Sequence, residues 1–170
     1  KLMKGFIGSA NIDTNSRLCM SSAVVAHKRA FGEDVVPGCY EDLELADLVI
    51  LTGSNTAWAH PIVYQRIAAA KQARPDMKVV VIDPRRTATC DLADLHLAIR
   101  PGQDVPLFNG LLTWLDDHNA LDQDYIDAHT EGFDSTLHTA RKQGNDWHAL
   151  AEQMGVSQVD LTTFYHWFAA

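Results

Sequence analysis

The sequence has few cysteines, and none of them is spaced to bind a metal cluster. Cys19, Cys39 and Cys90 are its three cysteines, and no two of them form a C-x-x-C pair. Zinc knuckles and iron–sulfur clusters need several closely spaced ligands, so this chain cannot supply such a set by itself. An odd number of unpaired cysteines is typical of a reducing compartment, which favours a cytoplasmic location. We expect Cys39 and Cys90 to pack in the interior.

The sequence also lacks long apolar runs and an excess of positive charge. No apolar run approaches the ~20 residues that a membrane-spanning helix needs. The formal net charge is −8, which argues against nucleic acid and against an anionic membrane as partners. With 46% hydrophobic and 21% charged residues, the composition is typical of a soluble globular protein. We expect residues 1–170 to form one domain.

Several common catalytic patterns are missing as well. The eight histidines form neither H-x-x-H nor H-E-x-x-H, and the sequence contains no nucleophile elbow and no convincing pair of catalytic carboxylates. It has no G-x-G-x-x-G fingerprint, which disfavours a standard NAD site. His60 precedes Pro61 and could line a site, cap a helix or pack in the core.

Strand-like and helix-like segments alternate in the middle of the chain. Short apolar runs at residues 47–52, 78–82 and 95–99 end in turn residues, which is typical of strands buried on both faces. Residues 62–74 and 104–118 have the apolar periodicity of amphipathic helices, and Asp104 could cap the second. In the first, the predicted inward side carries Ile62, Val63, Ile67 and Ala70. This alternation predicts an α/β fold, a three-layer sandwich with a mainly parallel, Rossmann-like sheet.

Each predicted strand is followed by a polar turn, at residues 52–56, 83–87 and 100–104. In open α/β sheets, ligands bind beyond the carboxyl ends of the strands. The first turn offers backbone amides, hydroxyls and a glycine that a pyrophosphate could approach. The second offers a carboxylate for a ribose or base and two arginines for phosphate or a purine. Each turn alone could be a simple strand-to-helix connection, but together they favour a nucleotide-like ligand.

Cys19 stands in a polar, helix-poor segment directly before a helix-like run at residues 21–31. The dipole of that helix and the nearby Arg17 favour a thiolate, which is a ligand that soft transition metals prefer. The alternative is that Cys19, between Leu18 and Met20, is a small buried hydrophobic residue.

Four motifs in a fixed order resemble the molybdenum bis-guanine-dinucleotide oxidoreductases, a family that includes formate dehydrogenases and nitrate reductases. They are Asn-x-Asp-x-Asn-Ser-Arg-x-Cys, Gly-Ser-Asn-x-x-x-x-His-Pro, Asp-Pro-Arg and Pro-Gly-x-Asp. The resemblance covers nearly the whole chain. Formate dehydrogenases carry His after the metal-ligating residue, whereas this chain carries Met20, as the cysteine-ligated nitrate reductases do. Residues 15–22 and 35–42 are most similar to cytoplasmic assimilatory nitrate reductases.

The resemblance implies a role for each motif. Cys19 would ligate molybdenum through sulfur, and both Cys19 and Met20 would be catalytic. The first turn would cradle one dinucleotide, the second would meet its guanosine part, and the third would complete the pocket. The implied cofactor-binding residues are Asn15, Thr52, Gly53, Ser54, Asn55, Asp83, Pro84, Arg85, Gly102, Gln103 and Asp104.

The resemblance also implies a larger parent subunit. The family's catalytic chain carries a four-cysteine iron–sulfur segment and further domains that hold the second dinucleotide, and residues 1–170 match neither. We therefore expect one domain of a subunit that reduces nitrate to nitrite with Mo-bis(molybdopterin guanine dinucleotide). The 4Fe-4S cluster of the parent would be bound outside this segment.

The implied partners are nitrate, an electron donor protein or reductase subunit, and the remaining domains of the parent chain. The segment alone is expected to be inactive. Two alternatives stay open: a formate dehydrogenase-like molybdoenzyme, and a nucleotide-binding module without redox chemistry in which Cys19 is merely packed.

Overall fold

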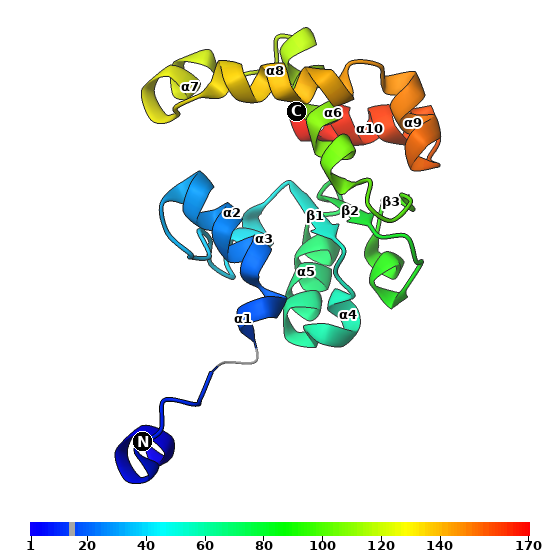
Figure 1. The fold of residues 1–170 in the computed structure, drawn as a ribbon. Coiled ribbons are helices and arrows are strands. Elements are labelled where there is room, and N and C mark those ends of the chain that lie inside the picture. Colours follow the sequence, from blue (N-terminus) through cyan, green and yellow to red (C-terminus); the bar gives the residue numbers. More distant parts are fainter. Residues whose placement is uncertain (14–15) are drawn as a thin grey trace. The chain divides into compact units, whose positions relative to one another are not determined.

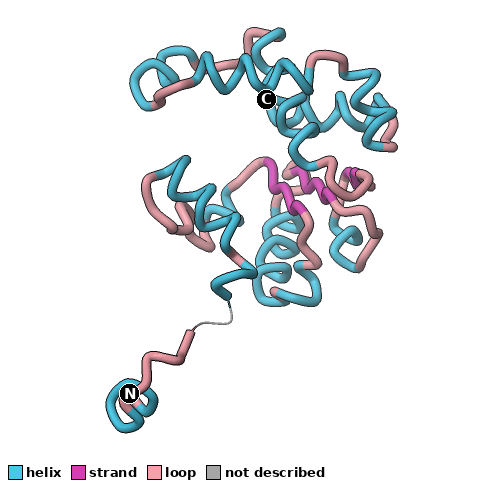
Figure 2. Tube along the Cα trace, viewed as in Figure 1, coloured by secondary structure: helices cyan, strands magenta, loops and turns pink. Residues whose placement is uncertain are grey.

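The computed structural model describes residues 1–13 and 16–170, except for the side chain of Arg17. The chain divides into two compact units, Lys1–Cys39 and Tyr40–Ala170, each described here by itself (Figures 1 and 2). Within the described residues, no helix is both long and apolar enough to cross a membrane.

Among its described residues, the first unit has three helical segments: η1 (Leu2–Ile7), α1 (Ser16–Cys19) and α2 (Ser21–Phe31). The bounds of α2 are those predicted from the sequence. It ends at Gly32, where φ is 81°, a left-handed conformation that glycine adopts without strain. None of the described residues of this unit is buried. The described residues of this unit therefore form no hydrophobic core of their own.

The second unit is built on three parallel strands, β1 (Leu48–Thr52), β2 (Lys78–Ile82) and β3 (Leu95–Leu97), in the order β1-β2-β3. The prediction that the first two are parallel neighbours is confirmed. The third strand ends at Leu97 and not at residue 99 as predicted. Its neighbour β2 gives way there to Asp83 and Pro84, and proline has no N–H to extend the pairing.

The helices of the second unit cover both faces of the sheet, with α4 and α5 on one side and α6, α9 and α10 on the other (Figure 1). Two residues differ from expectation: Ile62, predicted to face inward, is 69% exposed, and Gln103, not Asp104, holds the N-cap position of α6. The helical segments are α3 (Asp42–Leu45), α4 (Thr56–Ala59), α5 (Pro61–Ala73), the 3-10 helix η2 (Ala88–Leu92), α6 (Asp104–Asp117), α7 (Gln123–His129), α8 (Phe133–Gly144), α9 (Trp147–Met154) and α10 (Gln158–Ala169).

Successive side chains of β2 belong to opposite faces of the sheet. Val79 joins a core with Ile67 of α5, whereas Val80 and Ile82 join a second core with Leu107 of α6. This alternation is the period of two that an extended strand imposes. The three-layer α/β fold predicted from the apolar runs is therefore confirmed.

Asp94 extends the pairing of β2 with β3. Its backbone N–H donates to the Val79 carbonyl at 2.9 Å, and its carboxylate accepts from the Val79 N–H at 2.8 Å. Lys71 of α5 donates from Nζ to the same carboxylate at 2.6 Å and to the Met77 carbonyl at 2.9 Å. The Asp94 side chain thereby links α5 to β2, directly before the start of β3.

We expect Asp94→Asn to destabilise the fold at neutral pH but much less in acid. Burial alone would raise the pKa of Asp94, but the hydrogen bonds from Lys71 and Val79 outweigh it and lower that pKa. A lowered pKa stabilises the folded state above the unfolded value, about 3.9, and this contribution disappears as pH falls through the folded value. Urea unfolding near pH 7 and near pH 3 measures the difference.

Asp47→Asn is the matched control, because Asp47 pairs with Arg74 at 3.1 Å while its side chain is fully exposed. Exposed pairs contribute little, so this variant should stay close to the unsubstituted chain at both pH values. A stability deficit of Asp94→Asn that is the same in acid and at neutral pH would contradict the role of the charge.

Helices α6 and α8 approach each other backbone to backbone at Gly144. A Cβ atom added there would lie 2.8 Å from the carbonyl of Asn109 and from the nitrogen of Gly110. The Thr113 hydroxyl donates to the Gly144 carbonyl at 2.7 Å. This contact leaves no room for a side chain.

We expect Gly144→Ala to lower the free energy of unfolding by about 1–3 kcal/mol, the usual cost of forcing extra atoms into a packed contact. Gly5→Ala is the control, since a Cβ at Gly5 would have no atom within 4 Å. Urea unfolding of both variants tests the idea, and equal stability of the two would refute it.

Candidate functional site

The first polar turn leaves the end of β1 while staying bonded to β2. Gly53 has a φ of 59°, which favours glycine, and its N–H donates to the Ile82 carbonyl at 2.8 Å. The hydroxyls of Ser54 and Thr56 lie 2.8 Å apart. Thr52 and Gly53 are exposed, so the turn presents accessible backbone next to a fixed strand end.

The second polar turn begins with a well-fixed carboxylate. Asp83 is 8% exposed, its N–H donates to the Leu97 carbonyl at 3.2 Å, and its Oδ1 accepts from the Arg85 N–H at 2.7 Å. His96 Nε2 lies 2.8 Å from the Asp83 carbonyl oxygen. Pro84 and the side chain of Arg85 are exposed. The turn therefore combines a rigid carboxylate with an accessible guanidinium group.

A buried hydroxyl joins these two turns. Thr89, in η2 just beyond the second turn, is 0% exposed. Its Oγ1 accepts from the Ala57 N–H at 3.1 Å and donates to Oδ1 of Asn55 at 3.2 Å. The structure therefore brings the first and second turns together, as expected at the carboxyl edge of a parallel sheet. No local sequence pattern points to Thr89, because its partners lie 32 and 34 residues earlier.

Helix α5 is hydrogen-bonded to the start of η2, directly after the second turn. The Tyr64 hydroxyl donates to the Ala88 carbonyl at 3.1 Å. Burial raises the pKa of Tyr64, and the nearby Asp91 and Cys90 raise it further. The phenol therefore stays protonated, and able to donate this hydrogen bond, above its usual titration range.

The third polar turn is held by α9. The Arg100 N–H donates to the Met154 carbonyl at 2.8 Å, and the Gln153 amide donates to Oε1 of Gln103 at 2.7 Å. These hydrogen bonds of Arg100 and Gln103 thus run to the end of α9, whereas Thr89 links the first turn to η2, directly after the second turn. A single pocket formed by all three turns stays a prediction.

Cys19 is the last residue of α1 and is exposed, and Met20 follows it at the N-cap of α2. The predicted position directly before a helix is confirmed, but the segment is not helix-poor, since Ser16–Cys19 forms a helical turn. The hypothesis that Cys19 packs into a core is wrong for this structure. Asn15 lies outside the described residues, so its predicted role is untested.

The other two cysteines differ from each other. Cys90 is buried, as predicted, whereas Cys39 is exposed and the prediction that it packs is wrong. In the part of the chain that the structure describes, no group of three or more His, Cys, Asp or Glu side chains could hold a metal ion. A metal bound at Cys19 would need its other ligands from a cofactor or from elsewhere in the protein.

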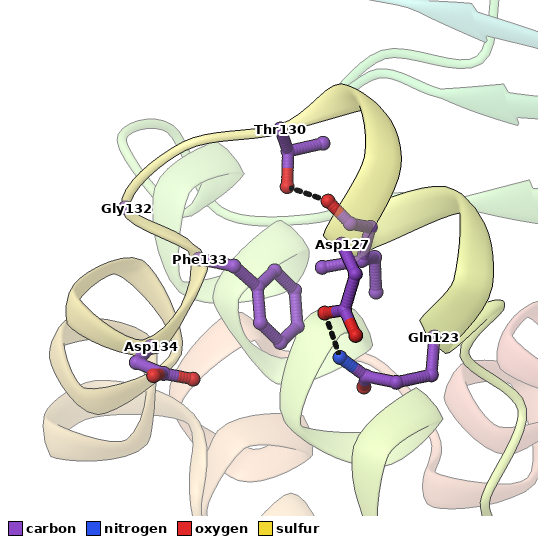
Figure 3. A pocket seen from close by; sticks show the side chains of 7 residues that line it. Gln123, Asp127, Thr130, Gly132, Phe133 and Asp134 are labelled. Carbon is purple, nitrogen blue, oxygen red and sulfur yellow. Dashed lines mark hydrogen bonds between the residues drawn. The ribbon is translucent and has the colours of Figure 1, made fainter.

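The hollow between α7 and α8 is not at the strand ends (Figure 3). It has a volume of about 310 Å³, and hydrogen bonds link four of its lining residues in two pairs. Gln123 donates to Asp127 at 2.7 Å, and the Thr130 hydroxyl donates to the Ile126 carbonyl at 2.8 Å. Part of the polar lining is therefore already paired. The candidate binding residues remain the strand-end turns of the second unit and, separately, Cys19 of the first unit.

Comparison with known proteins identifies the family of this chain. A family model described as molybdopterin oxidoreductase matches residues 1–157. This chain belongs to the molybdopterin oxidoreductase family. Membership implies a molybdenum–pterin cofactor.

Curated relatives are similar over nearly the whole chain. A nitrate reductase of Shewanella frigidimarina is 59% identical over 97% of this chain, and one of Klebsiella oxytoca is 55% identical over 100% of it. An assimilatory nitrate reductase of Haloferax mediterranei is 39% identical over 81% of the chain. The matched regions are 18%, 19% and 19% of those relatives, so the chain spans about a fifth of their length.

A solved structure shares the fold. Acetylene hydratase from Pelobacter acetylenicus superposes with a TM-score of 0.73 over 94% of this chain and 21% of its own, at 22% identity. At that identity the likeness speaks for the fold alone.

Proposed function

We propose that this chain is a domain of a molybdenum nitrate reductase that reduces nitrate to nitrite in nitrate assimilation. The observation that carries the substrate is the 59% and 55% identity to proteins named nitrate reductase. The relative named assimilatory supports the assimilatory type. A relative named periplasmic nitrate reductase is 43% identical, so the proposed cytoplasmic location rests on the likeness of residues 15–22 and 35–42 to assimilatory enzymes.

The proposed cofactor is Mo-bis(molybdopterin guanine dinucleotide), with Cys19 as the protein ligand to molybdenum. An exposed thiol directly before a helix fits this role, because sulfur is a soft ligand and this position leaves it accessible to a metal. When bound, the cofactor supplies the two-electron redox centre. Asn15 and Met20 are proposed to lie beside Cys19 at the metal-facing end.

The first two turns are proposed to hold one guanine dinucleotide. Residues 52–55 present exposed backbone and hydroxyl groups that suit phosphate oxygens, and Asp83 is a fixed acceptor for the N–H groups of guanine or the hydroxyls of ribose. The exposed Arg85 can pair with phosphate or stack on the purine. Gly102, Gln103 and Asp104 are proposed to complete the pocket.

The rest of the proposed enzyme lies outside this segment. Residues 1–170 would be one domain of the parent subunit, which would bind a 4Fe-4S cluster elsewhere and take electrons from a donor protein or reductase subunit. The segment alone would be inactive. The formate dehydrogenase-like alternative has less support, because Met20 and the named relatives both favour nitrate reduction. Family membership argues against a module without redox chemistry.

In the full-length enzyme, we expect Cys19→Ser to abolish nearly all nitrate reduction while leaving the fold intact. A serine oxygen is a harder ligand and is rarely ionised near neutral pH. Losing an exposed sulfur should cost far less stability than the ~2–5 kcal/mol of an emptied core site. Steady-state nitrate reduction with a chemical electron donor, molybdenum content and melting temperature are measured together.

Cys39→Ser is the matched control, because Cys39 is also exposed in the first unit but outside the proposed ligand motif. It should retain near-normal turnover. If Cys19→Ser also kept near-normal turnover at full molybdenum content, Cys19 would not be the metal ligand.

We expect Met20→His to weaken nitrate turnover without displacing the metal. The resemblance places histidine at this position in formate dehydrogenases, so the change alters the surroundings of the reacting atoms and spares the proposed ligand. Nitrate reduction per bound molybdenum should fall, while molybdenum per protein stays constant. Loss of metal in proportion to activity would instead show that Met20 helps to retain the cofactor.

A further inference from the structure

Helix α4 takes its N-terminal cap from another part of the chain. Asn55 holds the N-cap position, yet its side chain makes no capping hydrogen bond to α4. The Ala57 N–H, one of the donors that a helix start leaves unpaired, bonds instead to the Thr89 hydroxyl at 3.1 Å. Thr87 shows the usual arrangement, because its own side chain caps η2 through the Thr89 N–H. Thr89 therefore supplies the capping hydrogen bond that the side chain at the N-cap position, Asn55, would normally make.

The same hydroxyl also fixes how Asn55 is turned. Thr89 Oγ1 donates to Oδ1 of Asn55 at 3.2 Å. Because a side-chain amide is planar, holding its oxygen sets the direction of its nitrogen. Among the residues that the structure describes, Nδ2 of Asn55 has no hydrogen-bond partner, and this side chain is only half-buried. An amide nitrogen can only donate, so a matching ligand atom must be an acceptor.

We propose that Thr89 is a positioning residue for the guanine dinucleotide, acting through Asn55. Its hydroxyl holds the Asn55 oxygen so that the amide nitrogen donates to an acceptor of the cofactor, a phosphate oxygen or a guanine O6 or N7. Thr89 itself is 0% exposed and does not meet the ligand. Thr89 Oγ1 also connects the end of the second turn to the first turn, so the conformation of the first turn depends on that of the second. This inference rests on the proposed function, which supplies the dinucleotide.

The test uses the full-length enzyme with Thr89→Val, which keeps the shape and removes the hydroxyl, and Thr89→Ser, which keeps the hydroxyl. Guanine nucleotide released on denaturation and molybdenum are measured per protein after prolonged dilution. Losing the fixed amide should speed cofactor loss about tenfold, while Thr89→Ser restores the unsubstituted rate. Equal retention by Thr89→Val and Thr89→Ser would overturn the proposal.

A double variant separates positioning from simple destabilisation. If Thr89 acts through Asn55, then Thr89→Val combined with Asn55→Ala should lose the cofactor no faster than Asn55→Ala alone. Additive losses would show an independent structural role and would overturn the inference. Asn55→Asp tests the same idea if Thr89→Val does not fold, because it keeps an acceptor for Thr89 and replaces the donor nitrogen with oxygen. Full cofactor retention by Asn55→Asp would also overturn it.

Arg85→Ala distinguishes failure of this inference from failure of the proposed site. Arg85 is exposed, and its side chain takes no part in the described Thr89 hydrogen bonds. If Arg85→Ala loses guanine nucleotide while Thr89→Val retains it, the site stands and the positioning role fails. If Arg85→Ala, Asn55→Asp and Thr89→Val all retain it, these turns do not bind the dinucleotide and both proposals fail.

Discussion

Val79, Val80 and Val81 of β2 are completely buried, because helices pack against both faces of the sheet. A sheet covered on both sides favours parallel strands joined by helical crossovers, and this topology brings all the carboxyl ends to one edge. The chain leaves the cores at that edge, where its backbone groups need new partners. Thr89, Asp83 and His96 supply some of them. The geometry of the candidate site therefore follows from the burial of one strand.

The sequence predicted best where a single effect decides the outcome. The valine-rich run of β2 is typical of a buried strand, because β-branched apolar residues pack well on both faces of a covered sheet. Its predicted bounds agree with the structure. The first two turns could be located because they follow such runs directly. The role of Thr89 could not be predicted, since it depends on hydrogen bonds to residues 32 and 34 positions away. The prediction that Ile62 faces inward was wrong. Helical periodicity shows which side of α5 is apolar, but not whether the sheet extends far enough to cover the first turn of that helix.

The first unit shows the limit of local prediction in another way. The bounds of α2 could be predicted, yet the unit buries none of its described residues. Leu18, Val25 and Phe31 are all more than half exposed. Ordering a chain costs about 1–2 kcal/mol per residue in backbone entropy, which mainly burial of apolar surface offsets. If the chain is one domain of a larger enzyme, as proposed, other parts of that enzyme would cover these exposed apolar side chains.

The strand-end turns of the second unit and the Cys19 segment of the first unit therefore differ in how firmly each is held within its own unit. The turns after β1 and β2 are anchored to buried strands and joined by a buried hydroxyl, so their donors and acceptors are fixed before a ligand arrives. Cys19 lies in the first unit, none of whose described residues is buried. Preorganised groups bind more tightly because less freedom is lost on binding. The dinucleotide turns would thus supply most of the cofactor's affinity and orientation, and the cysteine would act mainly on the electronic properties of the metal.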